Sequence, residues 1–275
     1  MKKPKIFIGE MSEEQYFSLS DTHISRSDLQ NLVEGNLVTS GTPSTQFGSR
    51  IHSMIERKIR TNRPIKVLPK KDQAKTKEHP SYDYYYLPPV EAIETSNCMR
   101  AYNIYAEERK HKAWEPETTI VIPACLLPEL RVKLLDDPYR MPLFDHLLPL
   151  FDHLVNTGLG LRARLDILDR TERNIIDWKT TSEKTVTGIK RSIVGKYNYL
   201  LQVAFYALIC KLADISIFDF TFVYLIKSKA PTPPVEVTVP LYAEKVHTMI
   251  KNYLDGYLPG VNKKYNDTKL ISLTL

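Results

Sequence analysis

The sequence predicts a mixed α/β domain in which helices flank a central β-sheet. Three observations favour this class. Helical periodicity dominates the first half of the chain, strand-like segments begin near residue 117, and one largely apolar helix interrupts those strands. With 275 residues the chain is long enough to bury a sizeable core. We expect a single domain over 1–275, with its core at about 44–60 and 115–257.

The composition sets broad limits on function. The chain is 43% hydrophobic and 25% charged, as in ordinary globular proteins, and no apolar run approaches the roughly 20 residues that span a bilayer. We therefore expect no membrane association. Three scattered cysteines without a CxxC pair argue against a zinc ribbon or an iron–sulfur cluster and suit a reducing cytoplasm. A net charge of +6 is compatible with an anionic partner such as nucleic acid.

The expected N-terminal part is helical. A short helix is predicted to begin around Ser25 to Ser27, where Ser or Asp can cap it. A second helix is predicted at about 44–60, and a third at 90–114. Residues 61–90, rich in proline and lysine, are expected to form a surface loop or insertion. The apolar repeat that predicts the second helix consists of Phe47, Ile51, Met54, Ile55 and Ile59.

The expected sheet follows. Residues 117–123 have strand character, whereas 124–157 are ambiguous between helix and strand plus loop and are interpreted as an insertion. A hairpin is predicted over 159–181, with Leu161, Ala163, Leu165 and Ile167 on one face of its first strand.

The order then closes with a buried helix, two strands and a helix. The apolar stretch 197–213 predicts the buried helix. Strands are predicted at 217–228 and 234–240, and the closing helix at 242–258.

The hairpin carries the first group that can do chemistry. Asp177 and Lys179 are two residues apart and share one strand face, while Ile176 and Trp178 face the other way. Asp166 lies on the polar face of the preceding strand, so the turn can bring the two carboxylates within reach of one divalent cation. Lys179 could then prepare a water or stabilise charge on a phosphate. The alternative is an ordinary solvated strand edge.

Two helices could add to this group. His52 and Glu56 are four residues apart, hence on one helical face, and Arg50 nearby could contact phosphate; the alternative is an exposed polar stripe. Gln202 and Tyr206 repeat that spacing within the apolar helix. A buried amide and phenol need partners, so they either close a structural hydrogen bond or line a site.

In order along the chain, "GSRIHSMIE", "LRARLD", "IIDWKTT" and "QVAFY" resemble the PD-(D/E)XK nuclease superfamily. The resemblance is strongest to the branch of phage exonuclease VIII and the nuclease domain of bacterial recombination helicase–nucleases. It implies a restriction-endonuclease-like core and an Mg²⁺- or Mn²⁺-dependent DNA exonuclease that processes duplex ends for recombination. An endonuclease of the same fold and a DNA-binding protein on a decayed nuclease fold are the alternatives.

The same resemblance assigns roles to residues. It implies a metal held by His52, Asp166 and Asp177, the carbonyl of Trp178 and Glu117 as further ligands, and Thr180 as part of the D-x-K-T motif. Glu117 could instead merely cap its strand. The resemblance also implies a bacterial or phage-infected cytoplasm, a possible ring-shaped homo-oligomer and a possible single-strand annealing partner. The residues expected at the reaction centre are Asp166, Asp177, Lys179, Glu56, Gln202 and Tyr206.

Basic side chains near these residues could hold DNA through its phosphates without reading sequence. They lie on the strand of Asp166 and between the second hairpin strand and the apolar helix. Each by itself fits an ordinary surface charge better than a DNA contact, but together they suggest a binding face. The candidates, besides Arg50 and Thr180, are Arg162, Arg164, Lys184, Lys190 and Arg191. The aromatic run "YDYYY" could stack on unpaired bases or simply pack.

Overall fold

The protein is described by a computed structural model. It covers residues 5–7, 23–25, 43–109, 114–138, 142–156, 160–193 and 199–252.

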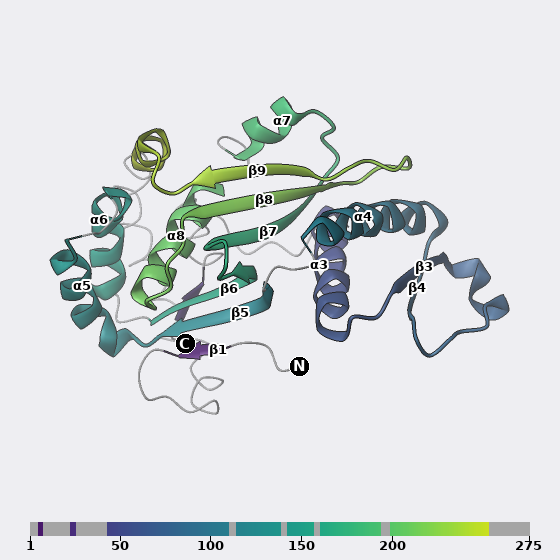
Figure 1. Cartoon of the computed structure of the whole chain (residues 1–275), viewed down its shortest axis with the longest axis horizontal. Coiled ribbons are helices and arrows are strands. Elements are labelled where there is room, and N and C mark those ends of the chain that lie inside the picture. Colours follow the sequence, from purple (N-terminus) through teal and green to yellow (C-terminus); the bar gives the residue numbers. More distant parts are fainter. Residues whose placement is uncertain are drawn as a thin grey trace, which may run out of the picture.

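A mixed seven-stranded sheet forms the centre of the molecule, as predicted (Figure 1). Its main path runs β1-β5-β6-β7-β8-β9, and β2 pairs with β6 outside that path. The strands are β1 (Lys5–Phe7), β2 (His23–Ser25), β5 (Trp114–Ile122), β6 (Gly160–Asp169), β7 (Asn174–Thr181), β8 (Asp219–Ile226) and β9 (Val235–Pro240).

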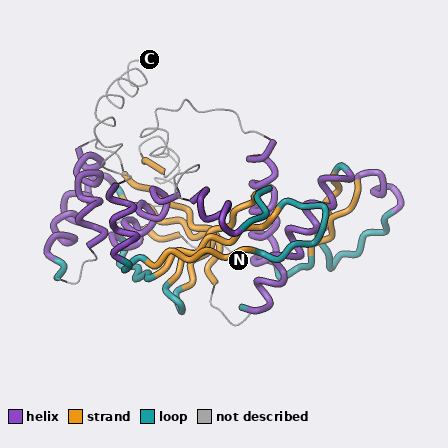
Figure 2. Tube along the Cα trace, turned by 90° about the horizontal axis from the view of Figure 1, so that it is seen from above, coloured by secondary structure: helices purple, strands orange, loops and turns teal. Residues whose placement is uncertain are grey.

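Helices cover both faces of this sheet, also as predicted (Figure 2). One apolar cluster joins the sheet to α5, α6 and α8, and a second joins it to α3 and α4. Alternate residues of β7 divide between them, Ile175 in the first and Ile176 in the second, so the clusters lie on opposite faces. The helices are α3 (Pro43–Thr61), α4 (Pro89–Glu108), α5 (Leu127–Asp136), α6 (Pro142–Asn156), α7 (Val186–Arg191) and α8 (Tyr199–Leu212).

The ends of the chain differ in part from the prediction. Ser25 ends β2, so it does not begin a helix, and residues 26–42, where the rest of the expected helix would lie, are outside the described part. Of the predicted closing helix, residues 244–252 are helical and 253–258 lie outside the described part. Among the described residues, no helix is both long and apolar enough to cross a bilayer.

Residues 61–90 contain regular structure where the sequence predicted a surface loop or insertion. They form a small parallel sheet, β3 (Ile65–Pro69) with β4 (Asp83–Leu87), joined by the 3-10 helix η2 (Lys70–Lys75). Figures 1 and 2 both show this sheet at the end of the molecule opposite α5 and α6. We call residues 62–88 the β3–β4 lobe. Short strands amid prolines and lysines give little hydrophobic periodicity, which is why the pattern was missed.

The described residues of 124–157, the segment that the sequence left ambiguous, are mostly helical. It contains the 3-10 helix η3 (Ala124–Leu126), α5 and α6. Leu143, Phe144, Leu147 and Phe151 of α6 are buried in the first apolar cluster. Their spacing of one, three and four residues is helical, and this segment thus extends the core on the α8 side of the sheet.

The predicted face of Ile167 is wrong. Leu161, Ala163 and Leu165 do share one cluster, but Ile167 belongs to the other, with α3 and α4, and Leu168 returns to the first. The alternation of β6 therefore breaks between Leu165 and Ile167. On β5, the residue opposite this break is Glu117, whose φ of 52° is unusual for a side chain other than glycine. The change of face on β6 thus lies directly opposite the unusual backbone of Glu117.

An ion-pair cluster ties the β3–β4 lobe to α3. Arg57 donates two hydrogen bonds to Asp83, at 2.7 and 2.9 Å, and Arg63 lies 3.4 Å from the same carboxylate. The Arg57 hydrogen bond, with its charge, holds the pKa of Asp83 below its ordinary value although burial opposes this. Because the side chain of Arg57 is 51% exposed, water screens the pair.

Asp83→Asn should lower the free energy of unfolding by about 1 kcal/mol at pH 7, because it removes the charge that both arginines contact. A carboxyl whose folded pKa is depressed stabilises the protein above its unfolded pKa. That contribution is lost as the pH falls through the folded pKa. Urea titrations should therefore show the difference between wild type and Asp83→Asn narrowing below about pH 4.

Asp72→Asn is the matched control, since it removes a lobe carboxylate that does not contact Arg57. It should leave stability within about 0.5 kcal/mol of wild type. Equal stabilities of wild type and Asp83→Asn at pH 7 would contradict the anchoring role of this cluster.

Candidate active site

Three acidic residues lie in one row across neighbouring strands. The β5–β6 ladder pairs Pro116 with Ile167 and Thr118 with Leu165, so Glu117 and Asp166 oppose each other. The β6–β7 ladder ends at Ile167 and Ile176, and the next position along it would set Asp166 opposite Asp177. At the other end of β6, β2 pairs with residues 160–162 on the edge that β7 has left. The candidate site occupies the place where β6 and β7 separate.

Asp177 is buried and held from two sides. Lys179 Nζ lies 2.6 Å from Asp177 Oδ2, and the Gln202 side-chain amide of α8 donates to Asp177 Oδ1. Lys179 also donates to Gln202 Oε1 at 3.2 Å, which closes a three-membered network. The predicted common face of Asp177 and Lys179 is thus present in the geometry. Gln202 makes one hydrogen bond with each of them.

Asp166 is held by α3 and by the backbone of β7. His52 Nδ1 lies 3.2 Å from Asp166 Oδ2, and the Trp178 amide N–H donates to the same oxygen at 2.9 Å. The contact explains why β6 and β7 stop pairing here, because the Trp178 amide bonds a side chain where a ladder would have supplied a carbonyl. His52 and Asp166 are brought together from residues 114 positions apart in the chain.

Burial and charge pull the two aspartates in opposite directions. Burial raises the pKa of Asp177 above its ordinary value, and the Lys179 charge only partly offsets this. Burial acts the same way on Asp166, but the charge and hydrogen bond of His52 outweigh it and lower the pKa. Burial alone would lower the pKa of His52, yet the charge of Asp166 raises it. Two adjacent carboxylates with divergent proton affinities are common at functional sites.

Glu117 completes the row. Its side chain is buried, and Arg164 Nε of β6 lies 2.7 Å from Glu117 Oε2. The strained φ of Glu117 costs about 1 to 3 kcal/mol, and strain of this kind concentrates at functional sites. Tyr206 of α8 donates its hydroxyl to the Arg164 carbonyl at 3.1 Å and so ties α8 to the same part of β6.

The donor types of this row suit a hard divalent cation, which prefers carboxylate oxygens and accepts imidazole nitrogen. Asp177 Oδ2 is buried and engages Lys179 as an ion pair without hydrogen-bond geometry. Among the described residues, no three His, Cys, Asp or Glu side chains already converge on one point. Each acid instead contacts a basic side chain of the protein, so metal binding would replace or move those contacts.

The remaining predicted residues lie around this group. Glu56, one helical turn beyond His52, accepts a hydrogen bond from Arg60 at 2.8 Å. Arg50 pairs with Glu91 of α4, which places its guanidinium at the junction of α3 and α4. Thr180 is half-buried beside α3. A Cβ on Gly48 would lie 3.1 Å from its Oγ1, so the helix packs closely on β7 there.

The predicted basic group divides between two places. Arg162 and Arg164 are on β6, the first half-buried and the second exposed and paired with Glu117. Lys184, Lys190 and Arg191 are exposed on the turn after β7 and on α7.

Sequence patterns missed the aromatic support of Lys179. Its Nζ lies 4.7 Å from the ring centre of Tyr199 and 5.9 Å from that of Phe222. Cation–π contacts of this kind favour a charged ammonium. Tyr199 precedes Gln202 by three residues on α8, so helical spacing could have indicated it. Phe222 pairs with Asp177 across β7 and β8, which only the strand register shows.

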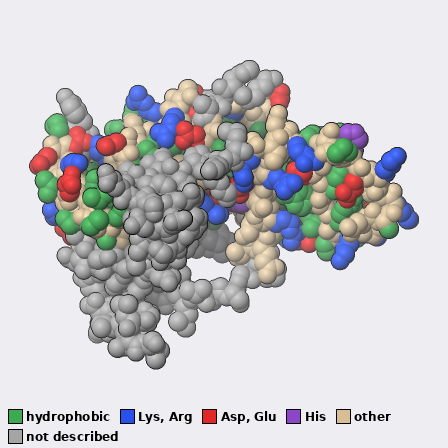
Figure 3. Space-filling model, turned by 90° about the horizontal axis from the view of Figure 1, so that it is seen from below, with side chains coloured by type: hydrophobic (Ala, Val, Ile, Leu, Met, Phe, Trp, Pro, Cys, Tyr) green, Lys and Arg blue, Asp and Glu red, His purple; other side chains and the backbone are tan. Residues whose placement is uncertain are grey.

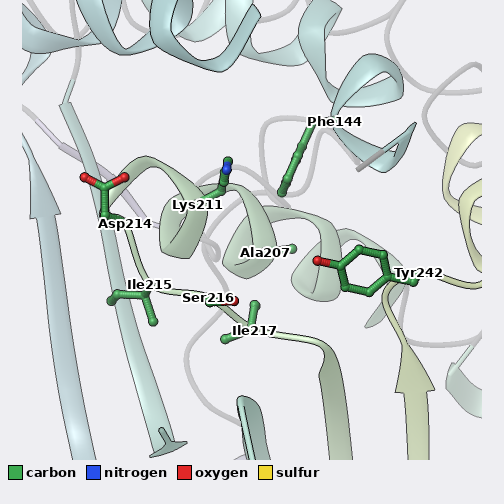
Figure 4. A pocket seen from close by; sticks show the side chains of 8 residues that line it. All are labelled: Phe144, Ala207, Lys211, Asp214, Ile215, Ser216, Ile217 and Tyr242. Carbon is green, nitrogen blue, oxygen red and sulfur yellow. The ribbon is translucent and has the colours of Figure 1, made fainter. Parts of the chain in front are cut away.

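A separate cavity of about 160 Å³ lies at the far end of α8 (Figure 4). Ala207 and Lys211 of α8 line it, together with Phe144, the 214–217 turn and Tyr242. Lys211 is nine residues beyond Gln202, about 13 Å along the helix axis. The cavity therefore shares no residue with the acidic row.

A family comparison agrees with this geometry. The model of the PD-(D/E)XK nuclease superfamily matches residues 28–253, which is most of the chain and includes every residue of the acidic row. The chain belongs to the PD-(D/E)XK nuclease superfamily, and its mixed sheet with flanking helices is the restriction-endonuclease-like fold. Membership implies a nuclease with DNA as its substrate, and such enzymes typically use Mg²⁺ or Mn²⁺. No curated protein matches the sequence.

The close approach of α3 to β7 makes a testable prediction. In an exposed helix, Gly→Ala gains up to about 1 kcal/mol, but at Gly48 the new methyl group would meet Thr180 Oγ1. The change in the free energy of unfolding caused by Gly48→Ala should therefore be more stabilising in a Thr180→Ala background than in the wild type. Urea unfolding of the four proteins of this double-mutant cycle measures the coupling.

Thr181→Ala provides the matched background, since Thr181 is the next residue and its side chain accepts a hydrogen bond from Glu183. Gly48→Ala should not couple to it. A zero coupling between Gly48 and Thr180, or an equal one with Thr181, would contradict the packing described here.

Proposed function

We propose that the protein is a metal-dependent DNA exonuclease that processes double-stranded ends for recombination. The observation that carries this proposal is the row of buried Glu117, half-buried Asp166 and buried Asp177, with Lys179 beside it. A hydrolase of phosphodiesters needs acidic ligands for a cation and a basic group near the reacting water. The motif order supports the narrower assignment to the exonuclease VIII-like branch.

Asp166, Asp177 and His52 would hold the cation, with Glu117 and the Trp178 carbonyl as further ligands. A bound Mg²⁺ or Mn²⁺ would supply charge stabilisation on the phosphate and a more acidic water. The contacts of His52 and of the Trp178 amide keep Asp166 charged and hold its side chain in place. The cation would have to draw the acids away from their present basic partners, because among the described residues no three such ligands converge on one point.

Lys179 would orient the water and stabilise negative charge on the phosphate. Lys179 forms an ion pair with Asp177 and donates a hydrogen bond to Gln202, and the Tyr199 ring lies beside its ammonium group. Gln202 would hold the Asp177 and Lys179 pair together, and Tyr206 would position β6 through the Arg164 carbonyl. Glu56, Arg50 and Thr180 would act at the edge of this group, toward α3.

DNA would be held by basic side chains around the row. Arg162, Lys184, Lys190 and Arg191 are the candidates, and Arg164 would join them if a cation displaced it from Glu117. The resemblance adds two partners to the proposal: further copies of the chain in a ring, and a single-strand annealing protein. Analytical ultracentrifugation tests the first and co-purification the second.

Asp177→Asn and Lys179→Ala should each reduce DNA hydrolysis by at least about a thousandfold, because each removes a group placed at the reaction centre. Circular dichroism should show a folded protein in both cases, since Asn keeps the shape of Asp177. Initial rates on linear duplex DNA with Mg²⁺ measure the effect.

Asp136→Asn and Lys245→Ala are the matched controls, because they make the same chemical changes at exposed positions outside the row. They should retain wild-type rates. If either Asp177→Asn or Lys179→Ala hydrolysed DNA at the wild-type rate, the proposed mechanism would be ruled out.

End dependence separates an exonuclease from an endonuclease of the same fold. We expect degradation of linear duplex DNA with Mg²⁺ or Mn²⁺, no nicking of closed circular DNA, and no reaction in chelator. Gel electrophoresis of the two substrates over time is sufficient. Nicking of circles would favour a structure-specific endonuclease, and the absence of cleavage with either metal would favour a non-catalytic DNA-binding protein.

A further inference from the structure

The β3–β4 lobe has two chemically different faces. Asp83 and Tyr85 of β4 face α3, where Arg57 binds Asp83 and Tyr85 packs against the cluster of α3 and α4. By strand alternation, Tyr84 and Tyr86 face the other way. Lys66 of β3, the register partner of Tyr84, lies on that outer face too.

The outer face carries a row of aromatic rings. Tyr84 and Tyr86 are stacked with their ring planes 11° apart and their centres 6.4 Å apart, and Tyr82 adjoins Tyr84 at 6.2 Å. The three rings are half-buried, so part of each remains accessible. Lys66 Nζ lies 3.9 Å from the ring centre of Tyr82.

Two hydrogen bonds fix the row from its edge. Tyr86 donates its hydroxyl to Glu78, and the His79 amide donates to the Tyr84 hydroxyl at 3.1 Å. The rings are therefore positioned before any ligand arrives, which lowers the entropic cost of binding.

Positive charge is concentrated on the lobe that carries the rings. Residues 62–82 contain six Lys or Arg and two Asp or Glu, in a chain whose net charge is +6. Figure 3 shows blue basic side chains spread over this lobe. The five lysines are exposed, and none forms an ion pair within the part of the chain that the structure describes: Lys66, Lys70, Lys71, Lys75 and Lys77.

Stacked rings together with lysines that form no ion pair suit a single-stranded nucleic acid better than a duplex. A duplex hides the faces of its bases and offers phosphates, whereas a single strand offers phosphates together with base faces that can stack on aromatic rings. Arg57, which anchors the lobe, follows His52 by five residues on α3, about 7.5 Å along the helix axis. The lobe is therefore tied to the helix that also reaches the acidic row.

We infer that the outer face of the β3–β4 lobe binds single-stranded DNA, with bases stacked on Tyr82, Tyr84 and Tyr86 and phosphates held by the lobe lysines. The inference rests on the proposed nuclease function, because it supplies the strand that is left, or fed, when a duplex end is processed at the acidic row. It adds a binding site that the reaction centre itself does not require.

The test measures binding of the full chain to a labelled oligothymidylate and to a duplex by fluorescence anisotropy, in chelator so that no hydrolysis occurs. Tyr84→Ala with Tyr86→Ala should weaken oligothymidylate binding by about tenfold or more. Duplex binding should change much less. Unchanged oligothymidylate affinity in this double variant would overturn the inference.

Two further variants separate stacking from folding. Tyr84→Phe with Tyr86→Phe removes both hydroxyl contacts but keeps the rings, so it should bind oligothymidylate nearly as the wild type does. Tyr242→Ala, which removes a tyrosine that is 55% exposed elsewhere on the surface, should have no effect. An equal loss in the Phe and Ala double variants would overturn the stacking role.

If the alanine variant fails to fold, photo-crosslinking of the wild type to an iodouracil oligonucleotide decides the question. Crosslinks within 82–86 are expected, and crosslinks found only outside 62–88 would overturn the inference. Binding without metal also separates this inference from the proposed activity. A chain that binds through these tyrosines but cleaves no DNA would contradict only the activity, and one that cleaves normally but binds without them would contradict only the lobe.

Discussion

The structure depends on how three carboxylates are placed at neighbouring positions of the central sheet. Glu117, Asp166 and Asp177 occupy one row across β5, β6 and β7, and burial of unpaired charges at such spacing would cost several kcal/mol for each ion. Each acid is therefore contacted by a basic side chain: Arg164 contacts Glu117, His52 contacts Asp166 and Lys179 contacts Asp177. Two features of the backbone occur at this row: β6 separates from β7, and Glu117 has an unusual φ. A bound divalent cation would offset the mutual repulsion of the three carboxylates.

Helix α3 connects the two parts of the molecule that could meet DNA. Gly48 brings the helix close to Thr180, His52 reaches Asp166, and Arg57 anchors the β3–β4 lobe through Asp83. Three contacts spaced along one helix fix the lobe relative to the acidic row. A rigid link of this kind would let a surface for one strand and a centre for phosphodiester hydrolysis share one substrate.

Much of the sheet and its helices could be predicted from the sequence, because β7, β8 and α8 carry strong local patterns. The common face of Asp177 and Lys179 follows from strand period alone. The lobe strands were missed since prolines and lysines obscure their periodicity. Ile167 was placed on the wrong face since the break in the alternation of β6 has no compositional mark. The partner of Arg164 and the support of Lys179 by Phe222 depend on strand register, which no single segment encodes. Domain boundaries and the roles of the site residues stay predictions.

The central claim is that the acidic row is a metal site, and calorimetric titration with Mn²⁺ in the absence of DNA tests it most directly. The wild type should bind Mn²⁺, and Asp166→Asn and Asp177→Asn should each lose measurable binding while Asp72→Asn retains it. Binding to both site variants with wild-type affinity would contradict the claim, because the cation would then be held elsewhere.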